Sequence, residues 1–220
     1  MSAQDPFAFE RLAAMRRSYV EGGLDEADLA PTWLDQLRLW IAEADRHEVI
    51  EPNAMILATA GTDGVPSART VLLKGLSETG FVFFTNQRSR KASQLDGNPR
   101  AALLFPWHPL QRQVHVEGDV ERVSDADSDV YWASRPRGSQ IGSLASPQSD
   151  VVGSRRELET AAGELASRYD NQEVPRPAHW GGYRVVPRTV EFWQGRQDRL
   201  HDRLRYRREE ADWVVERLAP

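Results

Sequence analysis

The chain has 220 residues, enough for one sizeable core, and its 40% hydrophobic and 28% charged residues are typical of a globular protein. It contains no cysteine, which excludes disulfides, thiolate metal sites and a cysteine nucleophile, and its net charge of −5 argues against a general nucleic-acid binder. Its apolar runs are too short to span a bilayer and no signal peptide is recognisable, so we expect no membrane association and a cytoplasmic location.

The first part of the chain is predicted to be helical. Apolar spacing over residues 5–19 predicts a short helix, which the glycines at 22 and 23 end. Thr32 is a suitable N-cap with Asp35 three residues on, so a second helix is predicted to begin there. We interpret residues 1–220 as one domain in which residues 1–30 form a partly mobile N-terminal segment.

From residue 54 the pattern changes to short strands and tight turns. Strands are predicted over residues 54–60, 65–74, 81–86, 101–107, 113–123, 183–186, 190–194, 199–206 and 213–218, with turns at 61–64 and 75–80. Helices are predicted after three serine caps: Ser89 (residues 90–96), Ser124 (to about 134) and Ser154 (to 169). This pattern predicts a mainly antiparallel β fold with peripheral helices, either a barrel or a sandwich.

The stretch from Arg199 to Arg203 is the first candidate ligand site. If it is a strand, Arg199, His201 and Arg203 share one face, because alternate residues of a strand point the same way. Three such groups repel one another unless an anion lies among them, although a solvated strand face is also possible. Like charge on both sides should disfavour protonation of His201.

Two lysines stand out because only Lys74 and Lys91 are lysines among the 28 basic residues. Lysine suits a phosphate oxygen, and Arg90 with Lys91 at a helix N-terminus would form an anion cradle. An ordinary surface role is equally open. Strict alternation places Arg69 and Lys74 on opposite faces of one strand, so a regular strand could not turn both toward one ligand.

Three polar residues spaced four apart form a further candidate site. Tyr131 and Arg135 fit one helix face, whereas Pro136 interrupts the helix, so Ser139 is expected to come from a loop. Together they would suit a phosphate dianion, and a surface helix end is the alternative. Trp193 fits either a stacking surface or the core, and the core is the more common role.

No metal site or nucleotide motif is recognisable. Four histidines without metal-ligand spacing are interpreted as structural: His47, His108, His115 and His179. The GxGxxG, Walker and GxSxG patterns are absent, which argues against a Rossmann or P-loop site and against a triad hydrolase.

Several longer motifs carry a family resemblance over nearly the whole chain. They are RTVLLK (69–74), FFTNQRSRKASQL (83–95), LLFPWHPLQRQV (103–114), SRPRGSQIG (134–142), WGGYRV (180–185), EFWQGRQDRLHDR (191–203) and the terminal ERLAP. On these motifs the chain resembles the pyridoxine/pyridoxamine 5′-phosphate oxidases, a family of FMN enzymes. The resemblance implies an FMN-binding split β-barrel of Greek-key type, working as a homodimer with FMN at the subunit interface.

The resemblance also implies a set of site residues. FMN would be held by Arg69, Thr70, Val71, Leu72, Leu73, Lys74, Phe84, Thr85, Arg90, Lys91, Gln113, Gln148, Ser149, Trp193 and Arg203. The substrate phosphate would meet Lys74, Tyr131, Arg135 and Ser139, its ring would meet Arg199 and His201, and Arg16, Arg17 and Tyr19 would lie in a segment that closes over it. Phe84 and Glu51 depart from the tyrosine and aspartate common at these positions.

The implied reaction is the oxidation of pyridoxamine or pyridoxine 5′-phosphate by O2 to pyridoxal 5′-phosphate and H2O2, with NH3 released from the amine. Arg199 and His201 would be the catalytic residues, and no metal is implied. Two alternatives remain: another split-barrel flavin or deazaflavin reductase that uses a nicotinamide donor, and a non-catalytic flavin or pyridoxal-phosphate carrier.

Overall fold

The computed structural model describes Tyr19 and residues 22–220. The helix predicted over residues 5–19 and the candidate residues Arg16 and Arg17 lie outside this part, and the mobility of residues 1–30 stays a prediction. Leu24 is buried in the core, and the Tyr206 hydroxyl donates a hydrogen bond to the Ala30 carbonyl oxygen at 2.6 Å. The described start of the chain therefore packs against its C-terminal strands.

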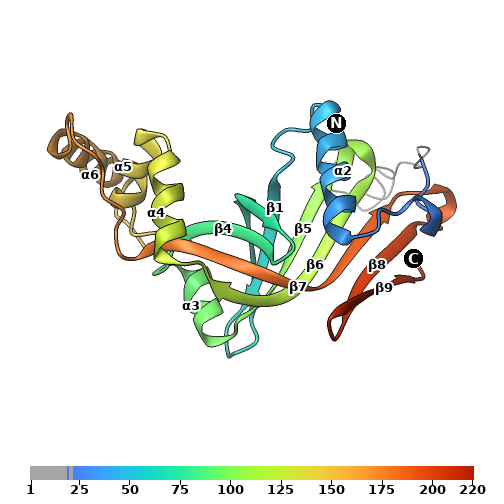
Figure 1. Cartoon of the computed structure of the whole chain (residues 1–220). Helices are drawn as coiled ribbons and strands as arrows, with labels where there is room; N and C mark the ends of the chain where they lie inside the picture. The colour runs from blue at the N-terminus through green and yellow to red at the C-terminus, as the bar shows by residue number, and fades with distance from the viewer. Residues whose placement is uncertain (1–18, 20–21) are drawn as a thin grey trace, which may run out of the picture.

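Within the described residues, nine strands form one antiparallel sheet (Figure 1). The strands are β1 (Ala54–Ala60), β2 (Pro66–Leu72), β3 (Gly75–Ser77), β4 (Gly80–Asn86), β5 (Arg100–Trp107), β6 (Arg112–Arg122), β7 (Trp180–Gln194), β8 (Asp202–Glu209) and β9 (Asp212–Arg217). Their order is β2-β1-β5-β6-β7-β4-β3, with β8 paired to β7 and β9 to β8. The sheet curls until β2 contacts β4, which makes a half-barrel and confirms the predicted antiparallel fold.

Five α-helices lie around this sheet in the part of the chain that the structure describes. They are α2 (Trp33–Arg46), α3 (Arg90–Gly97), α4 (Asp125–Ser134), α5 (Arg137–Ala145) and α6 (Arg155–Arg168). Figure 1 shows α4, α5 and α6 together at one end of the molecule, and the β8–β9 hairpin at the other end. Within the described residues, no helix is long and apolar enough to cross a membrane.

Three of the predicted side-chain caps form, at Thr32, Ser124 and Ser154, whereas the Ser89 side chain makes no capping hydrogen bond. The side-chain oxygens of Thr32, Ser124 and Ser154 each accept a hydrogen bond from the backbone N–H three residues on, and so satisfy a donor that the helix leaves free. Helix α2 packs its apolar stripe on the sheet, where the Trp40 ring lies edge-on to Phe192 at 5.1 Å. Truncating such a buried tryptophan costs about 3–5 kcal/mol, so this contact fixes α2 on the sheet.

Strand β7 is one continuous element of 15 residues, whereas the sequence predicted two strands separated by Pro187. Proline lacks the N–H that a sheet ladder needs, but β7 has a bulge next to it: Gly118 of β6 pairs with Pro187 and Glu117 pairs with Thr189, so Arg188 is skipped. A Cβ on Gly118 would lie 2.2 Å from the Val186 carbonyl oxygen. The irregularity and the glycine together let the strand pass through its proline.

Two further predictions were wrong. Residues 75–80 are not a simple turn, because Gly75–Ser77 form β3 against β4. Ser139 does not come from a loop but lies within α5, since Pro136 occupies the N-cap of a new helix, where its missing N–H costs nothing. A proline that ends one helix can begin the next.

The predicted strand over residues 199–206 begins later than expected. Arg199 lies in a 3₁₀ turn, Gln197–Arg199, and has a positive φ of 64°, as Asp198 has at 55°. Strand β8 begins only at Asp202, so strand alternation does not apply to Arg199 or His201. The expected common face of Arg199, His201 and Arg203 is therefore wrong.

Candidate functional site

A cavity of about 1120 Å³ lies between the edge of the half-barrel and the helical end of the molecule. Strands β2 and β4, the N-terminus of α3, helices α4 and α5, and the segment after α5 all contribute to its wall. Fourteen of the residues expected from the sequence line it: Arg69, Thr70, Val71, Leu72, Lys74, Phe84, Thr85, Arg90, Lys91, Tyr131, Arg135, Ser139, Gln148 and Ser149. Arg69 and Lys74 both reach it because β2 ends at Leu72, so alternation does not extend to Lys74.

The charged side chains that line this cavity are all positive. Five cationic side chains line it: Arg69, Lys74, Arg90, Lys91 and Arg135. Among the lining residues that the structure describes, none is acidic, although the whole chain carries a net charge of −5. Such a concentration of unpaired positive charge is characteristic of a site for an anionic ligand.

The Arg69 guanidinium is held by neutral oxygens. Its Nη1 donates to the Leu57 carbonyl oxygen at 3.1 Å and to the Thr59 hydroxyl at 2.6 Å, and its Nη2 donates to the Ser67 hydroxyl. Burial, and then the charge of Arg90, lower the pKa of Arg69. These contacts fix the direction of the side chain and leave its charge unneutralised.

The Lys91 side chain is buried and, like that of Arg69, is held by neutral oxygens. Its ammonium group donates to the Thr85 hydroxyl at 3.1 Å, to the Gln148 carboxamide oxygen at 3.2 Å and to the Ser89 hydroxyl at 3.4 Å. Burial, and then the charge of Arg69, lower the pKa of Lys91 to about 8. A phosphate beside this group would supply the negative charge that the protein does not.

The N-terminus of α3 adds backbone donors to the same corner. Ser89 occupies the N-cap, but its side chain makes no capping hydrogen bond. The Arg90 N–H donates to the Ser149 hydroxyl at 3.2 Å, and Ser149 has a φ of 81°. A helix N-terminus with basic side chains is a common phosphate site, and here it lies beside Lys91.

Aromatic rings form the opposite part of the wall. Phe84 stacks on Tyr131 with ring centroids 4.1 Å apart and on Trp180 at 5.5 Å. The Arg135 guanidinium lies 4.6 Å from the Trp180 ring centroid and donates to the Ser143 hydroxyl at 3.0 Å. Burial lowers the pKa of Arg135 more than neighbouring Tyr131 raises it. The wall offers a flat apolar surface next to a cation.

Several lining residues were not expected from the sequence. They are Asn86, Ser134, Pro136, Gly142, Ser143, Ser146 and Trp180. The helical period of α5 would have indicated Gly142 and Ser143, one turn after Ser139, and Ser146, a further turn on at the C-cap, had this helix been recognised. Leu73, expected at the site, is instead buried at 7% exposure in the core, so any contact to a ligand there would use its backbone.

Other expected residues lie away from the cavity, where the β8–β9 hairpin joins the sheet. Gln113, Trp193 and Arg203 stand opposite one another on β6, β7 and β8, so they form one row across the sheet. Arg203 Nε and Nη2 donate to the two carboxylate oxygens of Glu191 at 2.7 Å and 3.0 Å. The negative charge that was predicted near Arg203 is thus supplied by the protein itself, by the buried carboxylate of Glu191.

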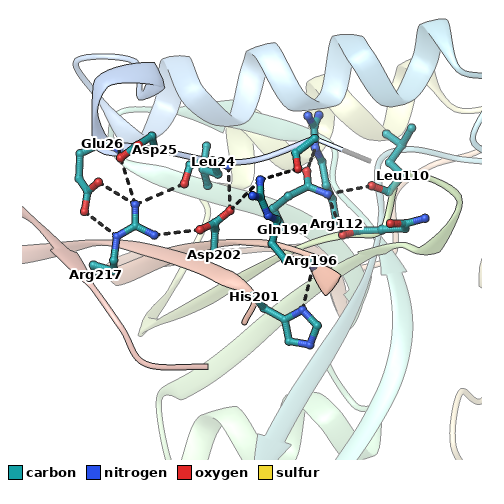
Figure 2. Close-up of polar contacts among 12 residues, drawn as sticks. Leu24, Asp25, Glu26, Leu110, Arg112, Gln194, Arg196, His201, Asp202 and Arg217 are labelled. Atoms are coloured by element: carbon teal, nitrogen blue, oxygen red, sulfur yellow. Dashed lines mark hydrogen bonds and ion pairs between the residues drawn. The ribbon is translucent and has the colours of Figure 1, made fainter. Parts of the chain in front are cut away.

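His201 belongs to a small aromatic cluster beside this row. Its ring centroid lies 4.6 Å from that of Trp193 and 5.6 Å from that of Tyr19. The Arg196 backbone N–H donates to His201 Nδ1 at 3.0 Å (Figure 2). Burial, and then Arg199, lower the pKa of His201, while Asp202 opposes them. The expected neutral imidazole fits this direction, although burial contributes more than the arginine.

The two groups of residues are far apart within one chain. Trp180 lines the cavity and Trp193 belongs to the hairpin row, yet both are on β7. Thirteen residues of strand extend roughly 43 Å at 3.3 Å per residue, less where the strand curls. The two groups of candidate residues therefore lie near opposite ends of β7 in one protomer.

Fold and cavity together define a split-barrel protein with an anion-binding site. A family model described as pyridoxamine 5′-phosphate oxidase matches residues 41–169, and one described as the pyridoxine 5′-phosphate oxidase C-terminal dimerisation region matches residues 180–220. The chain belongs to the pyridoxamine 5′-phosphate oxidase family, and it is an oxidoreductase, as expected.

Individual relatives agree with this assignment. A pyridoxine/pyridoxamine 5′-phosphate oxidase of Saccharopolyspora erythraea is 56% identical over 211 residues, which cover 95% of each chain. The crystal structure of PhzG from Burkholderia lata, in complex with tetrahydrophenazine-1-carboxylic acid, has a TM-score of 0.84 and 34% identity over 90% of this chain and 98% of that one. An FMN-binding, pyridoxamine 5′-phosphate oxidase-related protein of Nostoc punctiforme shares the fold, with a TM-score of 0.67 and 20% identity over 88% and 99% of the chains.

Proposed function

We propose that this chain uses FMN and O2 to oxidise pyridoxamine 5′-phosphate or pyridoxine 5′-phosphate to pyridoxal 5′-phosphate, in vitamin B6 biosynthesis and salvage. From the alcohol, one O2 is reduced to one H2O2. From the amine, one water is also consumed and one NH3 released. Family membership supports this reaction, and the cavity carries the argument for it.

The single observation that carries the proposal is a large cavity lined by five cations without an acidic side chain among its described lining residues. Its volume of about 1120 Å³ exceeds the roughly 300–1,000 Å³ of an ordinary ligand pocket. Cofactor and substrate each carry a phosphate, so the site needs room for two molecules and charge for two dianions. The cavity supplies both.

The donor set fits FMN. Arg90, Lys91 and the N-terminus of α3 would hold its phosphate, assisted by Thr85 and Ser149, since these groups form a compact cluster of donors. Arg69 to Lys74, Phe84 and Gln148 would line the rest of the cofactor. Bound FMN supplies the redox chemistry, by accepting a hydride from the substrate and returning the electrons to O2.

The substrate phosphate would lie at the other side of the cavity. Arg135 and Lys74 would neutralise it, and the hydroxyl groups of Tyr131 and Ser139 would donate hydrogen bonds. Tyr131 lies on α4, Arg135 is the C-cap of that helix, and Ser139 lies on α5, which begins directly after Pro136. Phosphate binding there would orient the substrate ring for reaction.

The remaining residues would be supplied by a second copy of the chain. Gln113, Trp193 and Arg203 would contact the flavin, and Arg199, His201, Tyr19, Arg16 and Arg17 would contact the substrate. The length of β7 supports this division, because one protomer cannot bring both groups to one ligand. A homodimer with FMN at the interface follows, and the matched dimerisation region agrees with it.

His201 would act as a hydrogen-bond donor at the substrate ring. Its Nδ1 accepts the Arg196 N–H, so the neutral imidazole carries its proton on Nε2. Arg199, on the exposed 3₁₀ turn beside it, would add positive charge near the ring. Both groups position the substrate and stabilise negative charge, whereas the electrons pass directly between substrate and cofactor.

Flavin reduction without oxygen tests the proposal. Anaerobic mixing of FMN-loaded protein with pyridoxamine 5′-phosphate should bleach the flavin absorbance, and NADH or NADPH should not. Arg199→Ala should slow this bleaching and keep the flavin bound; loss of FMN from that variant would contradict the substrate role of Arg199. Bleaching by a nicotinamide alone would indicate a reductase, and no bleaching by any donor would indicate a carrier.

A further inference from the structure

Asp202 stands next to His201 and makes contacts that no ligand role explains. Its carboxylate, only 17% exposed, accepts a hydrogen bond from the Leu24 N–H at 3.0 Å through Oδ2. Its Oδ1 accepts from Arg217 Nη1 at 2.9 Å, and Arg196 Nη1 lies 3.7 Å from Oδ2 (Figure 2). One carboxylate thus joins three separate segments of the chain.

The three segments are further tied to one another around Asp202. Arg196 Nη1 donates to the Gly22 carbonyl oxygen at 2.6 Å, and Arg217 Nη2 donates to Asp25 at 3.2 Å and to Glu26 at 2.7 Å. Figure 2 shows these contacts as one connected network. It links the chain that follows Tyr19 to the loop after β7 and to the end of β9.

The loop in this network carries the groups proposed to meet the substrate. It runs from Gly195 to His201 and contains two consecutive residues with positive φ, Asp198 and Arg199. Non-glycine residues adopt this conformation at a cost, so contacts from outside the loop must hold it. The Arg196 side chain provides such contacts, and the Arg196 backbone N–H holds His201 Nδ1.

We propose that Asp202 is a positioning residue for the reaction. By holding Arg196, Arg217 and Leu24 together, it keeps the Arg196 N–H on His201 Nδ1 and the substrate loop in its binding conformation. It touches neither substrate nor cofactor. The role at the substrate site rests on the proposed function, whereas the effect on His201 does not.

Two substitutions test this role against a matched control. Asp202→Ala removes all three contacts, and Asp202→Asn keeps the shape without the charge. Asp119→Ala is the control. Asp119, on β6, likewise pairs with two arginines, Arg188 at 2.6 Å and Arg100 at 3.8 Å. The measurements are KM and kcat for pyridoxamine 5′-phosphate, the FMN content, and the tautomer of His201 from ¹⁵N NMR, assigned by its loss in His201→Gln.

We expect the loss of Asp202 to change KM and the His201 tautomer but not the FMN content. Asp202→Ala should raise KM about tenfold, as expected for losing charge-assisted hydrogen bonds that preorganise a site, with FMN content kept. Asp202→Asn should be intermediate and Asp119→Ala like wild type. At pH 8, His201 should carry its proton on Nε2 alone in wild type, and Asp202→Ala should show a mixture with the Nδ1–H form.

Other outcomes overturn the proposal. An unchanged KM and tautomer in Asp202→Ala would show that the network does not position the loop. A parallel loss of FMN, folding and activity would show a general structural role instead. If the wild-type protein turned over neither substrate, the proposed function would fail, and the tautomer alone would still decide whether Asp202 positions His201.

Discussion

Trp180 and Trp193 lie on the same strand, β7, near its opposite ends, and each belongs to a different half of the candidate site. The strand pairs with β4 at its start and with β8 at its end, so the two groups of candidate residues lie at its two extremities. Two protomers arranged about a twofold axis would bring the cavity of one against the hairpin of the other, twice.

Mixed dimers should therefore restore activity to two impaired variants when turnover is measured at a substrate concentration below the wild-type KM. Arg135→Ala damages the cavity and Arg199→Ala damages the hairpin, and a heterodimer of the two contains one intact site. Random exchange of equal amounts should give about a quarter of wild-type activity, because half of the dimers are mixed and each has one working site of two. The assay is turnover after denaturation and joint refolding.

The control for this experiment is each variant refolded alone, which should stay far less active than the mixture at the same substrate concentration. A mixture no more active than the two separate variants would place both groups in the same protomer's site and contradict the division along β7.

Binding of FMN should depend on the charge of Lys91. The pKa of this group in the free protein is lowered to about 8, so it loses its proton as pH rises through that value, while the FMN phosphate stays dianionic. The apparent affinity for FMN should fall between pH 7.5 and 9.5, by up to about tenfold per unit beyond the shifted pKa. Titration of flavin fluorescence measures it.

Lys91→Arg gives the matched control, since arginine keeps its charge throughout this range. Its FMN affinity should be nearly independent of pH, even if the fit of the larger group lowers it. An equal pH dependence in both proteins would assign the titration to another group.

Arg135 should decide the preference for phosphorylated substrates. Its guanidinium lies 5.0 Å from the Trp132 ring centroid and 4.6 Å from that of Trp180, and Ser143 fixes its direction, so its charge is presented to the cavity at a defined place. Arg135→Ala should lower kcat/KM for pyridoxamine 5′-phosphate about 100-fold, the effect of losing roughly 3 kcal/mol from a charged hydrogen bond. Steady-state assays over a range of substrate concentrations would show this as a rise in KM.

Unphosphorylated pyridoxamine is the comparison within that experiment. Its much weaker turnover should be hardly changed by Arg135→Ala, and Arg135→Lys should recover only part of the loss, because lysine cannot stack in the same way. Equal losses for both substrates would mean that Arg135 acts on the fold rather than on the phosphate.

Local signals in the sequence predicted most of the elements. The cap at Thr32 fixed the start of α2 correctly, because one side chain satisfies one local backbone donor. Pro136 and Pro187 were misleading, because the first begins a helix and the second lies next to a bulge in β7, where Arg188 is left out of the pairing with β6. That bulge depends on Gly118 of β6, which is far from Pro187 in the sequence, so no local pattern around the proline could indicate it.

The candidate site was harder to predict for the same reason. Alternation assigned Arg199 to a strand, whereas its left-handed backbone depends on contacts between the loop and distant segments. The residues of the site could be predicted from the family motifs. Their division into two groups could not be predicted, because it follows from the length and pairing of β7. Strand alternation indicated a need for an anion near Arg203 without indicating Glu191.

The Glu191–Arg203 pair should matter for stability. Glu191 is 7% exposed and Arg203 has 31% of its side chain exposed, so the pair is partly shielded from solvent. Glu191→Gln should lower the free energy of unfolding by about 1–2 kcal/mol, because the guanidinium loses its charged partner in a poorly hydrated place. Urea denaturation of the FMN-loaded protein measures this change.

Glu159→Gln is a suitable control, since Glu159 pairs with Arg155 on the surface of α6 with 61% of its side chain exposed. Such pairs contribute a few tenths of a kcal/mol. If both substitutions cost the same small amount, the burial of the Glu191–Arg203 pair has no energetic consequence.

The most direct test of the account is aerobic turnover of pyridoxine 5′-phosphate by the purified, FMN-loaded protein, with pyridoxal 5′-phosphate and H2O2 measured together. We predict that both form in equal amounts without any nicotinamide, and that pyridoxamine 5′-phosphate gives the same ratio with an equal amount of NH3. Formation of neither product from either substrate, with FMN bound and the protein folded, would contradict the proposed function.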